Sequence, residues 1–81
     1  MMHVTILFYG AFRRLGASVV LNAEKMVKVG DLRPLLVEHI GKENKALVYD
    51  SVFANDTAIL DEGTMITADC TLSILPPVCG G

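Results

Sequence analysis

Cysteine is scarce in this sequence, which has only Cys70 and Cys79 among 81 residues. They form no CxxC pair, and no array of Cys and His surrounds them, so neither a disulphide framework nor a structural zinc site is indicated. The histidines, His3 and His39, are far apart and lack neighbouring ligands, so no metal site is expected. Sparse cysteine of this kind suits a reducing compartment, and the chain is expected to be cytoplasmic.

Long hydrophobic runs are also missing, although 52% of the residues are hydrophobic. No stretch approaches the roughly 20 apolar residues that cross a bilayer. The first apolar run, residues 3–9, follows no basic segment and is soon interrupted by Arg13 and Arg14. This run therefore predicts a strand and not a signal peptide, and no membrane partner is expected.

Basic residues are absent from the second half of the chain. Residues 1–45 hold all seven Lys and Arg against four acids, a net charge of +3, whereas residues 46–81 hold five acids and no base, a net charge of −5. An acidic half would repel a phosphate backbone, so nucleic acid is not an expected partner. A basic protein surface is a candidate partner, and a solvated acidic face explains the pattern equally well.

The remaining patterns predict one small domain built of strands around a helix. Apolar and alternating segments predict strands at residues 3–9, 18–21, 52–54, 57–60 and 71–75. The third and fourth of these form a hairpin, with Asn55 and Asp56 suited to the positive φ of a tight turn. Gly10 ends the first strand, and a loop carrying Arg13 and Arg14 follows it.

One helix is expected, from Asp31 to Gly41, because its apolar residues fall on one stripe: Leu32, Leu35, Leu36 and Ile40. Asp31 is expected to cap its start, Pro34 fits only its first turn and Gly41 ends it. A polar linker follows at residues 42–45 and no second helix is expected, which disfavours a ferredoxin-like fold. The fold class is therefore α+β, a β-grasp in which a mixed sheet of four to five strands packs on one main helix.

The tail, residues 76–81, is a candidate chemical site at the end of a single domain spanning residues 1–81. Pro76 and Pro77 stop the last strand and stiffen the exit from it. Gly80 and Gly81 have no Cβ, so another protein could close on their backbone. A terminal Gly-Gly alone is weak evidence, because chain ends often contain glycine. The combination of strand, proline pair and diglycine is more specific.

A terminal carboxylate at Gly81 would be ionised at neutral pH, since its ordinary pKa is roughly 3.3–3.7, and is a poor acyl donor. Its use as an electrophile requires activation by a partner, most simply with ATP. The chain has neither GxGxxG nor GxxxxGK[ST], so it is not expected to bind ATP or any other cofactor. It is expected to be a substrate of an enzyme and not to be catalytic alone.

The ending Leu75-Pro76-Pro77-Val78-Cys79-Gly80-Gly81 resembles the Phe-Pro-Pro-Val-x-Gly-Gly ending of the MoaD/ThiS sulphur carriers, in particular the small subunit of molybdopterin synthase. The opening Ile6-Leu7-Phe8-Tyr9-Gly10 resembles the first strand of that family. Val29-Gly30-Asp31-Leu32 resembles the entry to its helix. The resemblance spans essentially the whole chain.

This resemblance implies a function. An E1-like adenylyltransferase (MoeB/ThiF-like) would adenylate Gly81 with ATP, and sulphur from a cysteine desulphurase would convert it to a thiocarboxylate beside Gly80. The tail would then enter the MoaE-like large subunit of molybdopterin synthase and give the sulphur to cyclic pyranopterin monophosphate, in molybdenum cofactor biosynthesis. The residues implied at the docking interface are Phe8, Leu75, Pro76, Pro77, Val78 and Cys79.

Other interpretations stay open at this stage. Gly81 could instead be joined to lysines of other proteins, as in a ubiquitin-like modifier, or could serve thiamin, cysteine or tungsten pathways. A β-grasp interaction domain with an inert tail is a third alternative. The thiol of Cys79 could attack the activated Gly81 carbonyl, but a small residue at a variable tail position is favoured. Cys70 is expected to be a small strand residue, and a Cys70–Cys79 disulphide is disfavoured because it would pin the tail.

Overall fold

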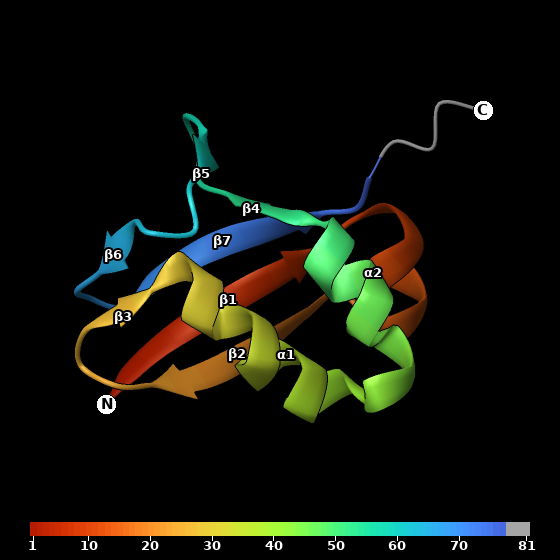
Figure 1. Ribbon diagram of the computed structural model, residues 1–81, viewed down its shortest axis with the longest axis horizontal. Coiled ribbons are helices and arrows are strands. Elements are labelled where there is room, and N and C mark those ends of the chain that lie inside the picture. Colours follow the sequence, from red (N-terminus) through yellow and green to blue (C-terminus); the bar gives the residue numbers. More distant parts are fainter. Residues whose placement is uncertain (78–81) are drawn as a thin grey trace.

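A mixed sheet of five strands carries the domain, in the order β2-β1-β7-β4-β5. The computed structural model describes residues 1–77 (Figure 1). The sheet consists of β1 (Met2–Phe8), β2 (Ser18–Ala23), β4 (Val52–Ala54), β5 (Ile59–Leu60) and β7 (Cys70–Leu75). β1 is antiparallel to β2 and parallel to β7, and β4 is antiparallel to both β7 and β5. The last strand is thus the central one, and the predicted β-grasp fold is confirmed.

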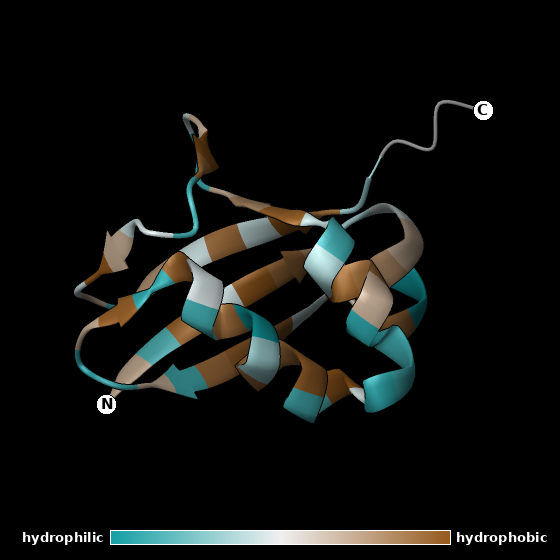
Figure 2. Ribbon diagram, viewed as in Figure 1, coloured by the Kyte–Doolittle hydropathy of each residue, from teal (hydrophilic) through white to brown (hydrophobic). Residues whose placement is uncertain are grey.

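The main helix, α1 (Leu32–Ile40), covers one face of this sheet (Figure 1). Strand residues alternate between the two faces, so that one set on each strand points toward the helix. The alternation of hydropathy along β1 and β7 is visible in Figure 2. Completely buried residues from both layers form the centre of the core: Val4, Ile6, Leu32, Leu36 and Ile74.

The two ends of α1 differ in how well the sequence predicted them. Pro34 lies in the first turn and Gly41 ends the helix with φ 106°, its N–H donating to the Val37 carbonyl at 2.8 Å. The predicted cap was wrong, because the Asp31 carboxylate accepts no bond from α1. A short 3-10 turn, η2 (Val29–Asp31), runs directly into the helix and gives Asp31 helical angles. An N-cap residue needs extended angles, so Asp31 Oδ2 instead accepts the Lys28 N–H at 3.2 Å.

A second helix, α2 (Lys45–Asp50), occupies a position where none was expected. It follows a 3-10 turn, η3 (Lys42–Asn44), and another 3-10 helix, η1 (Gly10–Leu15), replaces the predicted loop after β1. The absence of a second helix was therefore a wrong prediction. With six residues, α2 is too short to show a clear apolar period. Packing of the fully buried Val48 stabilises it, since so short a helix is not stable by itself.

The remaining strands, β3 (Val27–Lys28) and β6 (Met65–Ile66), form a separate two-stranded antiparallel sheet. This pair was not predicted, because two-residue strands leave no recognisable alternation. Val27 and Ile66 lie opposite each other in it and are both 7% exposed. The small sheet therefore covers the core at the end where β7 begins.

The β4–β5 hairpin was predicted correctly, but its turn is made differently. Among residues 1–77 only glycines have positive φ, so Asn55 and Asp56 do not supply it. The Asn55 side chain builds the turn instead, its Oδ1 accepting the N–H groups of Thr57 at 2.9 Å and Ala58 at 2.8 Å. Such a side chain replaces backbone acceptors and shapes the chain without left-handed residues.

Arg33 is a buried cation that the apolar stripe did not reveal. It is 7% exposed on α1, and its Nη1 donates to the Val48 carbonyl of α2 at 2.6 Å. Its Nε donates to Glu62 Oε1 at 2.7 Å, and its guanidinium lies 5.3 Å from the centre of the Phe53 ring. Arg33 thus connects α1, α2, β4 and the turn before β6.

No helix within residues 1–77 is long and apolar enough to span a membrane.

Candidate functional site

The tail follows β7, the central strand of the sheet. At its C-terminal end β7 has a neighbour on each side, with Ile74 opposite Phe8 of β1 and Leu75 opposite Val52 of β4. Pro76 follows and cannot donate to either ladder, so the pairing stops there, as predicted. In Figure 1 this end of β7 lies far from the N-terminus and on the side of η1 and α2. Two strands therefore fix the position from which the tail begins.

A contact between Gly10 and Pro76 sets the direction of that exit. Gly10 has φ 56°, a conformation that L side chains rarely adopt. A Cβ at this position would lie 2.7 Å from Pro76 Cγ and 3.5 Å from Pro76 Cδ. The proline ring therefore rests on a backbone that only glycine leaves open. The sequence predicted that Gly10 ends β1 but not that it receives Pro76.

Four of the expected docking residues lie in the described part of the chain, and the three at the end of β7 are accessible to different degrees. Leu75 and Pro76 are half-buried and Pro77 is exposed. Because Leu72 and Ile74 point into the core, Leu75 points to the opposite face of the sheet, away from α1. The remaining expected site residues, Val78, Cys79, Gly80 and Gly81, lie outside the described residues, and their roles stay predictions.

Phe8, the other expected docking residue, lies in the core. It is 1% exposed, and its ring lies 5.8 Å from that of Phe12 in a stacked arrangement. It occupies the face of β1 that points to the helix, in line with Val4 and Ile6, so the folded domain offers none of its surface to a partner. The expectation that Phe8 lines a docking surface is therefore not met in this structure, where Phe8 is a core residue of β1 opposite Ile74 of β7.

The exit is bordered by a basic segment that is tied to the helical layer. Arg13 and Arg14 of η1 are both exposed. Arg14 Nη2 donates to Asn44 Oδ1 at 2.9 Å, and Asn44 Nδ2 donates to the Ile40 carbonyl at 3.0 Å. Asn44 is only 2% exposed, so this chain of hydrogen bonds holds η1 against the end of α1. The sequence left open whether these arginines are simply solvated.

Two of the five acids of the second half are engaged with other parts of the domain. Glu62 pairs with Arg33, and Asp69 accepts the His3 N–H at 2.9 Å at the opposite end of β7. The strand β7 and the two prolines that follow it, residues 70–77, carry no charged side chain. A partner can recognise this part through apolar and backbone contacts and through the hydroxyl groups of Thr71 and Ser73, but not through an ion pair.

Cys70 is a strand residue, as expected, and its environment makes it a weak nucleophile. Burial raises the pKa of its thiol above the ordinary value, and the neighbouring Asp69 carboxylate adds to the effect. The thiolate is the reactive form of cysteine, so little of the reactive species is present at neutral pH. Within residues 1–77, no three His, Cys, Asp or Glu side chains are grouped so as to hold a metal ion.

Comparison with known proteins supports the fold. No protein-family model and no curated protein matches the sequence. Among solved structures, SAMP1 from Haloferax volcanii superposes with a TM-score of 0.75 at 15% identity, over 98% of this chain and 99% of that one. A Pyrococcus furiosus protein provisionally assigned as subunit 1 of molybdopterin converting factor gives 0.77 at 16% identity, over 96% and 100%. The ubiquitin of Caldiarchaeum subterraneum gives 0.67 at 17% identity, over 99% and 98%.

These similarities cover the whole length of each protein but are low in identity, so they establish the fold alone. The chain has the β-grasp fold of ubiquitin-like proteins, a fold that it shares with a small archaeal modifier protein and with the protein provisionally assigned as a molybdopterin converting factor subunit. Its last strand is central and ends at a proline pair held on Gly10.

Proposed function

We propose that this protein is a sulphur carrier that acts through Gly81 as its terminal residue, and that it serves as the small subunit of a molybdopterin synthase. The observation that carries the proposal is the exit of β7. A central strand, fixed on both sides, delivers an uncharged Leu75-Pro76-Pro77 neck into Val78-Cys79-Gly80-Gly81. This arrangement suits a rigid domain that presents a narrow tail to an enzyme.

The chemistry requires an activating partner, because a carboxylate does not accept a nucleophile. In the proposed sequence, a carboxylate oxygen of Gly81 attacks the α-phosphorus of ATP, forming the acyl-adenylate and releasing pyrophosphate. A sulphide nucleophile then displaces AMP and leaves a C–S bond at Gly81. If a cysteine persulphide supplies the sulphur, an acyl disulphide forms first, and a second thiol reduces it to the thiocarboxylate. An E1-like adenylyltransferase and a cysteine desulphurase are the proposed partners.

The structure contributes positioning to this scheme. Pro76 rests on Gly10, and Leu75 and Pro77 present apolar surface on either side of it. We assign these three residues to the surface that contacts the activating enzyme and the large subunit. Gly80 and Gly81 have no Cβ, which lets a partner's backbone close on the reacting carbonyl. Cys70 takes no part, because its thiol is partly buried and its pKa is raised.

Reconstitution tests the proposal. The full-length protein is incubated with a purified E1-like adenylyltransferase, ATP and sodium sulphide, and the exchange of pyrophosphate into ATP and the mass of the carrier are followed. We expect the exchange of pyrophosphate into ATP to depend on the presence of the carrier. We also expect the mass of the carrier to show that sulphur has replaced one oxygen. A variant lacking Gly80 and Gly81 should support neither. If the intact carrier stays an ordinary carboxylate while a known carrier is converted by the same enzyme, the proposal fails.

A second candidate function is conjugation of Gly81 to lysine side chains of other proteins. The similarity in fold to a small archaeal modifier protein and to an archaeal ubiquitin favours it. The same acyl-adenylate would serve, with a lysine amine in place of sulphide. Mass spectrometry of cell proteins distinguishes the two, because peptides with Gly81 linked to a lysine are expected only from a modifier.

A further inference from the structure

Strand β2 has an outer edge whose backbone groups are available. Among residues 1–77, β2 pairs with β1 alone. The Phe8 N–H donates to the Ala17 carbonyl at 2.9 Å, so these two residues face each other across the ladder. Consecutive residues of an antiparallel pair point their backbone groups alternately toward and away from the neighbour. The N–H and C=O groups of Ser18, Val20 and Asn22 therefore point outward.

This edge lacks the features that usually protect a sheet from further pairing. Proteins commonly use short strands, charged residues, proline or bulges at such edges. The opposite edge strand, β5, has only two residues. β2 has six, contains no charge and no proline, and its pairing with β1 continues without a bulge from Ser18 to Ala23. β2 is thus a template on which another strand can form.

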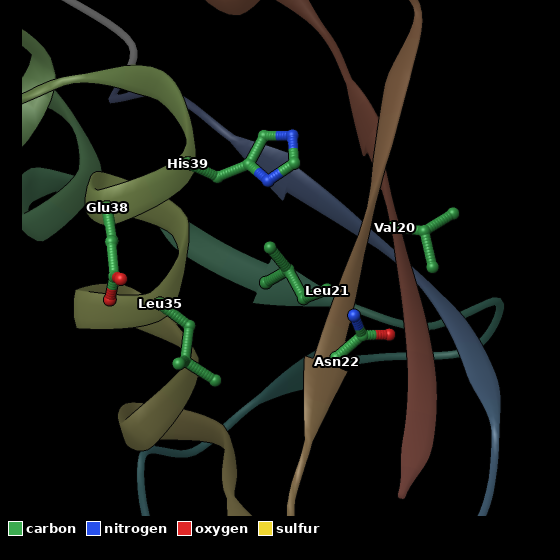
Figure 3. Close-up of a pocket in the computed structure, with 6 residues that line it drawn as sticks. All are labelled: Val20, Leu21, Asn22, Leu35, Glu38 and His39. Carbon is green, nitrogen blue, oxygen red and sulfur yellow. The ribbon is translucent and has the colours of Figure 1, made fainter.

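A groove runs between this edge and α1. Figure 3 shows Leu21, Leu35 and His39 projecting into the space between the strand and the helix, whereas Val20 points away from it. This part of the groove has a volume of about 330 Å³. A second hollow of about 360 Å³ shares Asn22 and Leu35 with it and extends toward the N-terminus of α1. Together they provide an apolar floor alongside the outward backbone groups of β2.

The rim of the groove is acidic. Glu38 lines its first part, and Glu24 and Asp31 line the second. No Lys or Arg is among the residues that line either part. The further ionisable groups are the side chain of His39 in the first part and the α-amino group of Met1 in the second, so three carboxylates outnumber the cations. An occupant with positive charge at its ends would complement this rim.

We infer that β2 accepts an extended segment of a partner protein as an additional strand, and that this segment alternates apolar with polar residues and carries Lys or Arg at its ends. Backbone hydrogen bonds to Ser18, Val20 and Asn22 supply affinity, and contacts with Leu35 and Glu38 supply specificity, as in other cases of strand addition. A second copy of the chain fits less well, because pairing β2 with β2 would bring two acidic rims together. The inference concerns a different edge of the sheet from the proposed function and does not depend on Gly81.

Titration of the isotope-labelled full-length protein with short peptides, followed by NMR, tests this inference. The probes are Lys-Val-Thr-Val-Thr-Val-Lys and the same peptide with Glu at both ends. We expect the Lys peptide to shift the amide signals of Ser18, Val20 and Asn22 most strongly and to bind more tightly than the Glu peptide. Glu38→Lys should weaken its binding by about two- to fivefold, as for one exposed charge pair. Asp56→Lys, the same change in the exposed β4–β5 turn, should leave it unaltered.

Three results would overturn the inference. One is the absence of shifts at β2 with millimolar peptide while the β1 and β7 signals show a folded protein. Another is equal binding of the Lys and Glu peptides. The third is a dimer in light scattering whose formation shifts the β2 amides without any peptide, since it would identify a second copy as the occupant.

Discussion

Gly10 and Pro76 are in direct contact, and a Cβ on Gly10 would lie only 2.7 Å from the proline Cγ. The contact joins the start of the tail to the residues that follow β1, just beyond the ends of these two neighbouring strands. Gly10 also has φ 56°. Glycine is therefore required here for two independent reasons, the positive φ and the close approach of Pro76.

Replacing Gly10 with Ala should therefore both destabilise the domain and displace Pro76. We expect a loss of about 1–3 kcal/mol in the free energy of unfolding, measured by urea denaturation, from backbone strain and from the clash. Gly16→Ala is the matched control, because Gly16 also has positive φ, at 126°, but a Cβ there would meet no atom within 4 Å. Adding Pro76→Ala should recover part of the loss for Gly10→Ala and none for Gly16→Ala. Equal recovery in both backgrounds would contradict the contact.

Arg33 should contribute more to the free energy of unfolding than an ordinary surface cation does. Arg33→Met removes the partner of the buried Val48 carbonyl, and we expect a cost of about 1–3 kcal/mol in thermal or urea unfolding. Glu62→Gln is the comparison, since the Glu62 side chain is 60% exposed and its ion pair should contribute less than about 1 kcal/mol. A larger effect at Glu62 than at Arg33 would show that the ion pair, and not the bond to Val48, dominates.

The turn of the β4–β5 hairpin should depend on the Asn55 side chain. Asn55→Ala removes the acceptor of the Thr57 and Ala58 N–H groups, and we expect a loss of about 1 kcal/mol. Asp56→Ala, next to it in the same turn, should change the free energy of unfolding by less than about 0.5 kcal/mol. Amide hydrogen exchange should speed up at Ala58 in the first variant and not in the second.

The Cys70 thiol should react slowly with alkylating reagents at neutral pH. Its pKa is raised by burial and by Asp69, so at any pH near neutrality it carries less thiolate than an exposed cysteine. In a Cys79→Ala variant, alkylation by iodoacetamide should be slower than that of a model peptide, and the rate should keep rising above the pH at which the peptide's rate levels off. A rate equal to the peptide's at pH 7 would contradict this.

Sequence reasoning was strongest where a pattern extends over several residues. The strands that became β1, β4, β5 and β7 were predicted close to their observed bounds, as was α1, because long apolar periodicities and the Pro34 and Gly41 signals agree. It failed for α2, β3 and β6, which have six residues or fewer and are held by tertiary contacts. Phe8 was misplaced because an apolar strand residue does not reveal which face it occupies.

The contacts around the end of β7 could also not be predicted from the sequence. Gly10 and Pro76 are 66 positions apart, so only the parallel pairing of β1 and β7 brings them together. Arg33 likewise appears as a polar residue of an amphipathic helix until Val48 and Glu62 are placed around it. The contact between Gly10 and Pro76 could have been suggested by two sequence signals, a glycine after one strand and a proline after another.

The intact mass of the protein purified from cells under conditions that induce molybdenum enzymes is the most direct test of a tail loaded with sulphur. We predict a population in which sulphur has replaced one oxygen at Gly81, and its loss in a strain without the E1-like adenylyltransferase. Finding only the unmodified carboxylate in both strains, with molybdenum enzymes fully active when Gly80 and Gly81 are deleted, would contradict the proposed function.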